Sequence, residues 1–284
     1  MSIRKYKLGS LLRYQVAEAT TMIFNIEAIN NKDQKICTEK LSFNPPLPFE
    51  QYTAIEVGGT RYVRVNAPAG KLEVSYEAIV DLCYFYAEPE TISEVPPSDL
   101  PMETLRYIYP SRYCQSDQLL GLVESEFNDL NQGYSRVSAI CDWIYEKVTY
   151  LSGSTNSQTS AYDTAMERKG VCRDFAHLGV AFCRALNIPA RFVSAYAYEL
   201  QPPDFHACFE AYLGDRWYLF DATRLVPLDG IVRIGIGRDA ADVSFATFFG
   251  SVQMEEMNIL IEPFSEIENR EDSDNAKGMA IAIS

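Results

Sequence analysis

Histidine is scarce in this chain of 284 residues, which contains only His177 and His206. Two imidazoles are too few for a histidine-rich metal centre. Paired cysteines are lacking as well: the 7 cysteines form no CxxC motif, and their odd number favours reduced thiols over a disulfide framework. No GxxxxGK[ST] run occurs, and Gly235 and Gly237 lack the third glycine of a dinucleotide loop. We therefore expect neither a metal nor a cofactor.

Positive charge is also in short supply. The chain has 25 lysines and arginines against 39 aspartates and glutamates, which gives a net charge of −14. This balance argues against nucleic acid or an anionic membrane as a partner. No apolar stretch is long enough for a transmembrane helix, and the basic start of the chain is not followed by the apolar region of a signal peptide. These observations predict a cytoplasmic protein.

What the chain does contain is enough apolar sequence for a large core, at 47% of its residues. Residues 1–95 are β-rich, with alternating polar and apolar positions and a hairpin signal at Gly58 and Gly59. Short strands separated by proline and glycine turns predict an all-β sandwich domain. Three prolines between residues 93 and 101 indicate a linker, and we assign residues 96–117 to it together with the approach to the next domain.

The hydrophobic period changes to that of helices after the linker. Helices are predicted over residues 118–130, 137–148, 161–168 and 172–186, and strands over 191–198, 206–213 and 216–220. Gly170 is expected to end the third helix as a C-cap. Helices followed by an antiparallel sheet predict an α+β domain over residues 118–262. Residues 263–284 are predicted to be an acidic, solvated C-terminal tail.

Cys172 stands at the start of the most strongly patterned helix, directly after a glycine turn. A cysteine inside a helix is most often a small buried hydrophobic residue, and this is our interpretation of Cys183 and Cys208. A thiol at a helix N-terminus is different, because the helix dipole and a neighbouring imidazolium favour the thiolate. Its position therefore makes Cys172 the candidate nucleophile.

His206 opens one predicted strand and Asp221 follows the next, across a turn at Gly214 and Asp215. If Leu213 and Arg216 flank this turn, Asp221 falls opposite Cys208, two residues from His206. Neighbours on such a diagonal are within reach of each other. A thiol, an imidazole and a carboxylate together suffice for nucleophilic acyl chemistry.

Other polar residues near these positions have simpler interpretations. His177 lies five residues after Cys172, too far round the helix to share its face, so a structural role is favoured. Asp174 in the first turn suits helix capping, and Glu210 is taken as structural or peripheral. A zinc site built on Cys172, His206 and Cys208 lacks both the spacing and a fourth ligand.

The combined motifs resemble the bacterial transglutaminase-like superfamily. The resemblance rests on residues 170–178, 187–191, 206 and 217–223, with weaker likeness at 109–113, 233–243 and the β-rich residues 1–95. It covers most of the chain except the acidic tail. It implies a papain-like core in which Cys172 is the nucleophile, His206 the base and then the acid, and Asp221 the residue that orients the imidazole.

The resemblance leaves the reaction open, because members of this superfamily transfer acyl groups, hydrolyse peptides or deamidate. Hydrolysis of peptide or protein amides through a cysteinyl thioester, as a cysteine peptidase or amidase, is our leading expectation. The alternatives are a transglutaminase and a non-catalytic protein-binding module. Arg173 stands where eukaryotic transglutaminases have tryptophan, and no calcium loop is present, which disfavours calcium-dependent crosslinking. The backbone N–H of Cys172, at the helix start, is expected to stabilise the oxyanion of the tetrahedral intermediate together with a second donor that the sequence does not identify.

Overall fold

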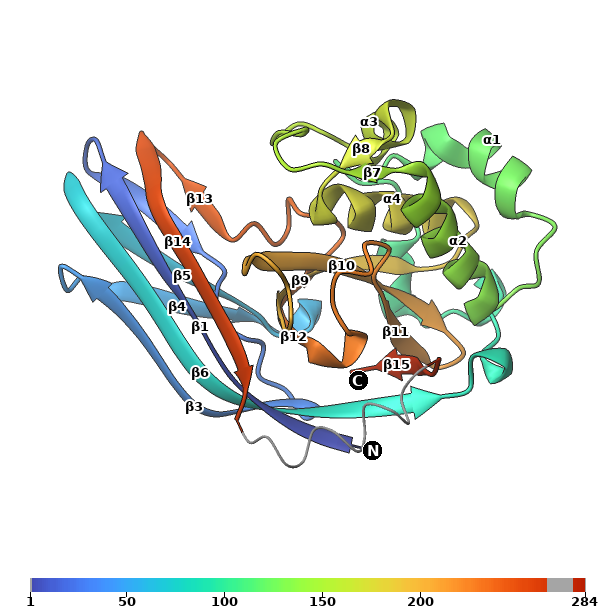
Figure 1. Cartoon of the computed structure of the whole chain (residues 1–284), viewed down its shortest axis with the longest axis horizontal. Helices are drawn as coiled ribbons and strands as arrows, with labels where there is room; N and C mark the ends of the chain where they lie inside the picture. The colour runs from blue at the N-terminus through green and yellow to red at the C-terminus, as the bar shows by residue number, and fades with distance from the viewer. Residues whose placement is uncertain (1, 265–277, 284) are drawn as a thin grey trace.

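The computed structural model describes residues 2–264 and 278–283. Within these residues the strands form two large sheets and one short pair (Figure 1). The nine-stranded sheet contains, in spatial order, β12 (Ile231–Gly237), β9 (Ala190–Ala197), β10 (Phe205–Leu213), β11 (Arg216–Phe220), β15 (Ala280–Ala282), β6 (Gly70–Ala87), β1 (Ser2–Val16) and β14 (Val252–Pro263), and β3 (Gln34–Asn44) also pairs with β6. The four-stranded sheet contains β13 (Ala246–Phe248), β2 (Thr20–Phe24), β5 (Thr60–Ala67) and β4 (Phe49–Ala54).

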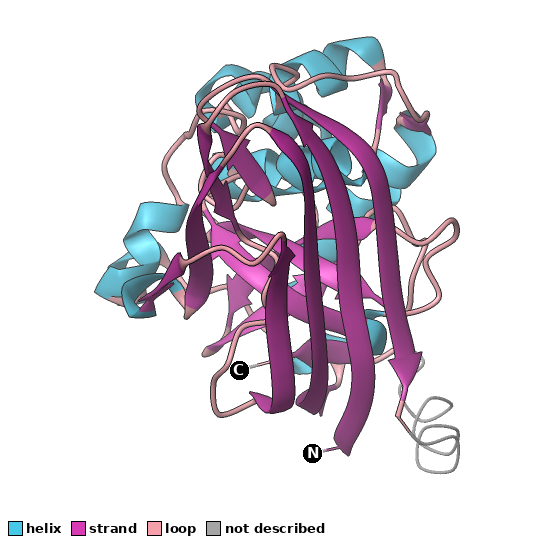
Figure 2. Ribbon diagram, turned by 90° about the vertical axis from the view of Figure 1, so that its left-hand side faces the viewer, coloured by secondary structure: helices cyan, strands magenta, loops and turns pink. Residues whose placement is uncertain are grey.

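The N-terminal part is a β-sandwich, as predicted. In β6 every second residue from Leu72 to Tyr84 is buried, which is the pattern of a strand with one face against a core. These side chains share one hydrophobic core with Phe24 of β2 and Val63 of β5. The long strands of the larger sheet therefore pack their inner face against the smaller sheet, as Figure 2 shows from the side.

The predicted hairpin at Gly58 and Gly59 is present between β4 and β5. The ladder closes at Ala54 and Thr60, and both glycines have positive φ angles, 77° and 86°. These angles are strained for residues that carry a Cβ. Strand β4 ends at Ala54, because Ile55–Val57 forms a 3₁₀ turn, η1.

The proline-rich segment between the sandwich and the helices contains only 3₁₀ turns. These are η2 (Pro89–Thr91), η3 (Pro97–Asp99) and η4 (Met102–Tyr107). Proline supplies no backbone N–H, which prevents longer helices and ladders from forming here.

The helices gather on one side of β9, β10 and β11 (Figure 1). They are α1 (Ser116–Phe127), α2 (Tyr134–Lys147), α3 (Ala161–Glu167) and α4 (Cys172–Ala185). Helix α4 packs closely on β10: a Cβ added at Gly179 would approach Cε1 of Phe209 to 2.4 Å. The α+β layout is confirmed. None of the helices in the described ranges has both the length and the apolarity needed to cross a membrane.

One helix end differs from the prediction. The left-handed C-cap of α3 is Arg168, with φ of 56°, whereas Gly170 belongs to a short strand, β8 (Lys169–Gly170). This strand pairs in parallel with β7 (Thr149–Tyr150). A Cβ at Gly170 would lie 2.7 Å from Cβ of Asp174, so a close approach to α4 explains the glycine.

The C-terminal strands return to the N-terminal sandwich. Strand β14, all but the last residue of which falls within the predicted domain of residues 118–262, pairs along β1, and β13 pairs with β2. Strand β15, placed in the predicted tail 263–284, is buried between β11 and β6. Residues 265–277 and 284 of that tail lie outside the described residues. Strand pairing thus crosses the predicted domain boundaries and joins both parts of the chain in one sheet.

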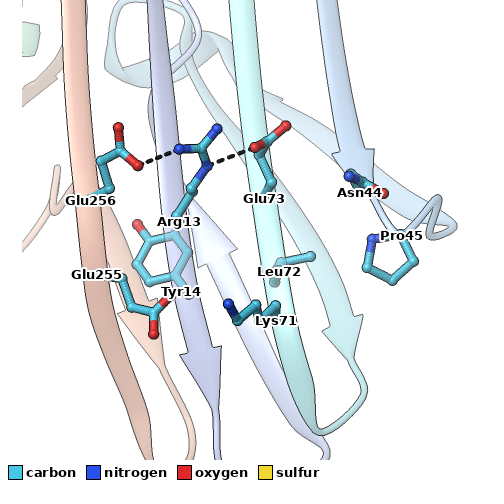
Figure 3. A pocket seen from close by; sticks show the side chains of 9 residues that line it. All are labelled: Arg13, Tyr14, Asn44, Pro45, Lys71, Leu72, Glu73, Glu255 and Glu256. Carbon is cyan, nitrogen blue, oxygen red and sulfur yellow. Dashed lines mark hydrogen bonds and ion pairs between the residues drawn. The ribbon is translucent and has the colours of Figure 1, made fainter.

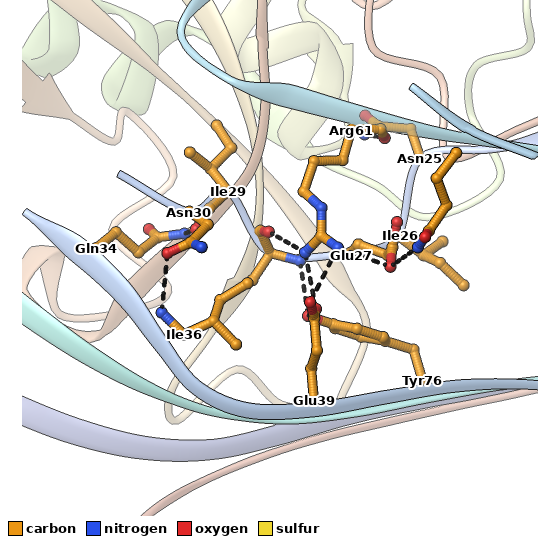
Figure 4. Close-up of polar contacts among 12 residues, drawn as sticks. Asn25, Ile26, Glu27, Ile29, Asn30, Gln34, Ile36, Glu39, Arg61 and Tyr76 are labelled. Atoms are coloured by element: carbon orange, nitrogen blue, oxygen red, sulfur yellow. Dashed lines mark hydrogen bonds and ion pairs between the residues drawn. The ribbon is translucent and has the colours of Figure 1, made fainter. Parts of the chain in front are cut away.

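A polar cluster lies between the sheets of the sandwich (Figure 4). Arg61 binds Glu27 at 3.0 Å and Glu39 at 2.7 Å, and Tyr76 donates to Glu39 at 3.0 Å. Burial raises the pKa of the Glu27 carboxyl, an effect that Arg61 opposes. Nearby, Gln34 binds the backbone of Arg233 through both its amide atoms. These contacts fix the sandwich against the strands of the core.

Candidate active site

Cys172 is the first residue of α4, and neighbouring polar groups fix where that helix begins. Asp174 accepts a hydrogen bond from the backbone N–H of Val171 at 2.9 Å. The hydroxyl of Thr155 donates to the same carboxylate at 2.8 Å. These bonds confirm the capping role of Asp174. They hold the partly exposed thiol of Cys172 at the positive end of the helix dipole.

His206 and Asp221 are brought together by the hairpin of β10 and β11. Its register runs from Leu213 opposite Arg216 to Phe209 opposite Phe220, as predicted. Asp221 follows directly, and its Oδ2 lies 2.8 Å from Nε2 of His206, with both side chains buried. The other oxygen, Oδ1, accepts hydrogen bonds from the backbone N–H and the hydroxyl of Thr223. The carboxylate is therefore held from two sides.

Two opposing effects set the protonation of His206. Burial lowers the pKa of the imidazole, but the Asp221 carboxylate and the Cys172 side chain together raise the pKa to about 10. Nε2 is bound to Asp221, which leaves Nδ1 for the thiol. Nδ1 is buried and has no well-aligned partner among the described residues, and such contacts often tighten only when substrate binds. The site thus pairs a thiol with an imidazole that stays protonated at neutral pH.

Tyr150 also belongs to this site, although no motif in the sequence points to it. It lies on β7 opposite Gly170, two residues before Cys172. Its hydroxyl interacts with both the backbone N–H and the side chain of Cys172. Burial, and then the neighbouring Cys172, raise the pKa of the Tyr150 phenol to about 12. The sequence signal was weak because a two-residue strand has no period.

His177 lies in a different environment, among aromatic rings. Its imidazole stacks on Tyr113 at 5.0 Å between centroids, and Phe192 covers it from another side. Nε2 accepts a hydrogen bond from the backbone N–H of Ala240 at 3.1 Å. Burial, and then Arg173 and Arg184, hold the pKa of His177 well below its usual value. These contacts agree with the structural role favoured from the sequence.

The remaining sequence candidates are buried structural groups. Glu210 is fully buried and paired with Arg191 at 2.6 Å and Arg233 at 3.1 Å. Cys183 and Cys208 are buried, and burial raises the pKa of both thiols, which keeps them protonated. Neither thiol therefore competes with Cys172 as a nucleophile.

A separate depression lies on the sandwich, with a volume of about 550 Å³. Its most prominent feature is Arg13, which forms ion pairs with Glu73 and Glu256 on the two flanking strands (Figure 3). It is lined by no thiol or imidazole, so it offers none of the groups of the Cys172 site. In the described part of the chain, no group of three or more potential metal-ligating side chains has an arrangement that would hold a metal ion.

Comparisons with known proteins agree with this geometry. Residues 123–222 match the family model of the transglutaminase-like superfamily, and residues 4–103 match that of the bacterial transglutaminase N-terminal domain. A crystal structure of a candidate cysteine protease from Cytophaga hutchinsonii has 45% sequence identity and a TM-score of 0.91, and the match covers 99% of this chain and 98% of that one.

Two mycobacterial relatives are described as uncharacterised proteins. A Mycobacterium leprae protein is 28% identical over 146 residues, which is 48% of this chain and 52% of the relative, so the match spans about half of that protein. A Mycobacterium bovis protein is 26% identical over 272 residues and matches 84% of this chain and 85% of its own length. The two family models and the solved structure at 45% identity establish that the chain belongs to the transglutaminase-like superfamily.

Proposed function

We propose that this protein is a cysteine-dependent acyl-transfer enzyme that acts on amide bonds of peptides or proteins. Cys172 is the nucleophile, His206 the general base and then the general acid, and Asp221 the residue that orients the imidazole. One observation carries the proposal: the imidazole of His206 is bound to Asp221 by a buried hydrogen bond of 2.8 Å and also contacts the thiol of Cys172 at the start of α4. A charged imidazole beside a thiol favours the reactive thiolate.

The reaction would proceed through a thioester. The Cys172 thiolate attacks the amide carbonyl, an S–C bond forms, and the carbonyl electron pair moves onto oxygen. When the tetrahedral intermediate collapses, the C=O bond forms again, the C–N bond breaks and His206 delivers its proton to the departing amine. Asp221 supports the imidazole in both steps, because it holds one tautomer and stabilises the charged form.

The second half-reaction decides between a peptidase and a transglutaminase. We favour hydrolysis, in which water attacks the thioester, and the likeness to a candidate cysteine protease supports this choice. Transfer to a primary amine is the second candidate, since the N-terminal family model is described as that of bacterial transglutaminases. The two differ only in the acceptor.

An acylating thiol probe tests the assignment of the nucleophile. We expect Cys172→Ala to abolish acylation of the protein at pH 7, because the variant lacks the thiol that contacts the protonated imidazole of His206. The matched control is Cys37→Ala, since Cys37 is exposed, and partial desolvation of its sulfur and then Asp81 raise the pKa of its thiol. Mass spectrometry of the labelled peptide measures the result. Stoichiometric acylation retained in Cys172→Ala would refute the proposal.

A glutamine-containing peptide then separates the two acceptors. Release of ammonia that is independent of an added primary amine indicates hydrolysis at the glutamine side chain, and cleavage of the peptide backbone indicates a peptidase. Incorporation of the amine into the peptide indicates transfer. The Cys172→Ala variant serves as the blank in each assay.

A further inference from the structure

Tyr150 is fixed next to the nucleophile by the pairing of two very short strands. The N–H of Thr149 bonds to the carbonyl of Arg168 at 2.8 Å, and the N–H of Leu151 bonds to that of Gly170 at 2.9 Å. The ring of Tyr150 packs on Phe175, one turn into α4, at 5.7 Å between centroids. Backbone and ring therefore place the phenol at the N-terminus of α4.

The hydroxyl of Tyr150 contacts the candidate nucleophile, Cys172. It interacts with the backbone N–H of Cys172 and with the thiol of the same residue. The tetrahedral oxyanion formed by attack of this sulfur needs donors in that region, and the Cys172 N–H at the helix start is one of them. The side chain of Tyr150 is 43% exposed, so a substrate can reach it.

We propose that the Tyr150 hydroxyl is the second donor to the oxyanion, a role that rests on the proposed function. In the free protein its oxygen accepts the N–H of Cys172. When a substrate carbonyl binds, that oxygen takes the N–H, and the released hydroxyl turns to donate its proton as a hydrogen bond. No proton is transferred, because burial and Cys172 keep the pKa of this phenol about 12. The S–C bond forms while the carbonyl electron pair becomes the oxyanion held by both donors.

The competing role for Tyr150 is structural. Its ring contact with Phe175 and its strand pairing with Gly170 would by themselves position α4 and hence the thiol. Tyr150→Phe separates the two roles, because it retains the ring and the backbone pairing and removes only the hydroxyl. Tyr162→Phe is the matched control, since Tyr162 is an exposed tyrosine on the neighbouring helix α3.

Two reactions of the same sulfur provide the test, both in a Cys37→Ala background. Acylation by p-nitrophenyl acetate passes through an oxyanion: an S–C bond forms, the C–O bond breaks and nitrophenolate leaves. Alkylation by iodoacetamide displaces iodide at a saturated carbon and forms no oxyanion. We expect Tyr150→Phe to slow acylation by about 10²-fold, the usual effect of removing one such donor, and to slow alkylation far less, because alkylation loses only the contact of the hydroxyl with the thiol.

The outcomes are distinguishable. Equal loss of acylation and alkylation in Tyr150→Phe would mean that the residue only positions the thiol, and unchanged acylation would mean that it does not stabilise the oxyanion. Either result overturns the inference and leaves the proposed function standing. Acylation that survives in Cys172→Ala would instead refute the proposed function itself. Tyr162→Phe should match the parent protein in both reactions.

Discussion

The two histidines lie in regions of the core that affect an imidazole in opposite ways. Both side chains are buried, at 1% exposure or less. His206, at the start of β10, meets the Asp221 carboxylate and the Cys172 side chain, and its pKa is raised to about 10 despite burial. His177, in α4, is buried near Arg173 and Arg184, and its pKa is lowered. One residue is held charged and the other neutral.

The difference lies in the partners and not in the depth of burial. Burial alone disfavours a charged imidazole, and nearby positive charge adds to that effect, whereas a hydrogen-bonded carboxylate reverses it. The neutral ring of His177 serves as an acceptor for the backbone N–H of Ala240. The charged ring of His206 instead lies between a thiol and a carboxylate. Polar partners thus separate a structural histidine from a candidate catalytic one.

The largest expected effect comes from removing the carboxylate that distinguishes the two regions. Asp221→Asn should lower the rate of Cys172 acylation by about 10⁴-fold, as in enzymes where the orienting carboxylate is replaced by its amide. The amide no longer stabilises the imidazolium, so His206 should come to resemble His177, and its pKa should fall. Acylation kinetics and NMR titration of the imidazole measure both effects.

Thr223→Val is the matched control for this change. It removes the hydroxyl that donates to Oδ1 of Asp221 but leaves the carboxylate on His206. Its rate should fall much less than that of Asp221→Asn. Equal rates for the parent protein and Asp221→Asn would contradict the assigned role of Asp221.

A smaller effect, on stability and not on chemistry, is expected in the other region. His177→Phe retains the aromatic packing against Tyr113 but leaves the Ala240 N–H without its acceptor. We expect the free energy of unfolding to fall by about 1–3 kcal/mol, the cost of one buried unpaired donor. Urea unfolding measures this value. The alkylation rate of Cys172 should not change, and a large loss of that rate would place His177 in the reaction.

Much of the site could be predicted from local sequence. The helix start at Cys172 follows from its hydrophobic period, and the meeting of His206 with Asp221 follows from the register of one tight hairpin. Both are short-range features, in which turn geometry fixes the pairing. The sandwich was predicted for the same reason, since strands with one buried face alternate regularly.

The features that the sequence did not reveal depend on long-range pairing. Tyr150 reaches Cys172 through two strands of two residues each, too short to show a period. Strand β14 pairs with β1 at the opposite end of the chain, whereas the predicted boundaries assigned most of it to the C-terminal domain. At the end of α3, Arg168 adopts the left-handed conformation that was expected of Gly170. A glycine is required at position 170 because Asp174 of α4 lies too close for a larger residue.

The subtlest expected difference between the two regions is in how stability depends on pH. The raised pKa of His206 stabilises the fold fully below about 6.5, the usual pKa of an unfolded histidine, and this stabilisation is lost as pH rises toward about 10. The lowered pKa of His177 has the opposite sign: the unfolded ring takes up a proton below about 6.5 that the folded ring refuses, so stability falls with acid. Urea unfolding from pH 5 to 10 should therefore give two difference curves with slopes of opposite sign, the slope due to His177 below about pH 6.5 and the slope due to His206 above it. The difference in the free energy of unfolding between the parent protein and Asp221→Asn should shrink as pH rises. The free energy of unfolding of the parent protein minus that of His177→Phe should grow as pH rises. Two curves of the same slope would show that the regions do not treat their imidazoles differently.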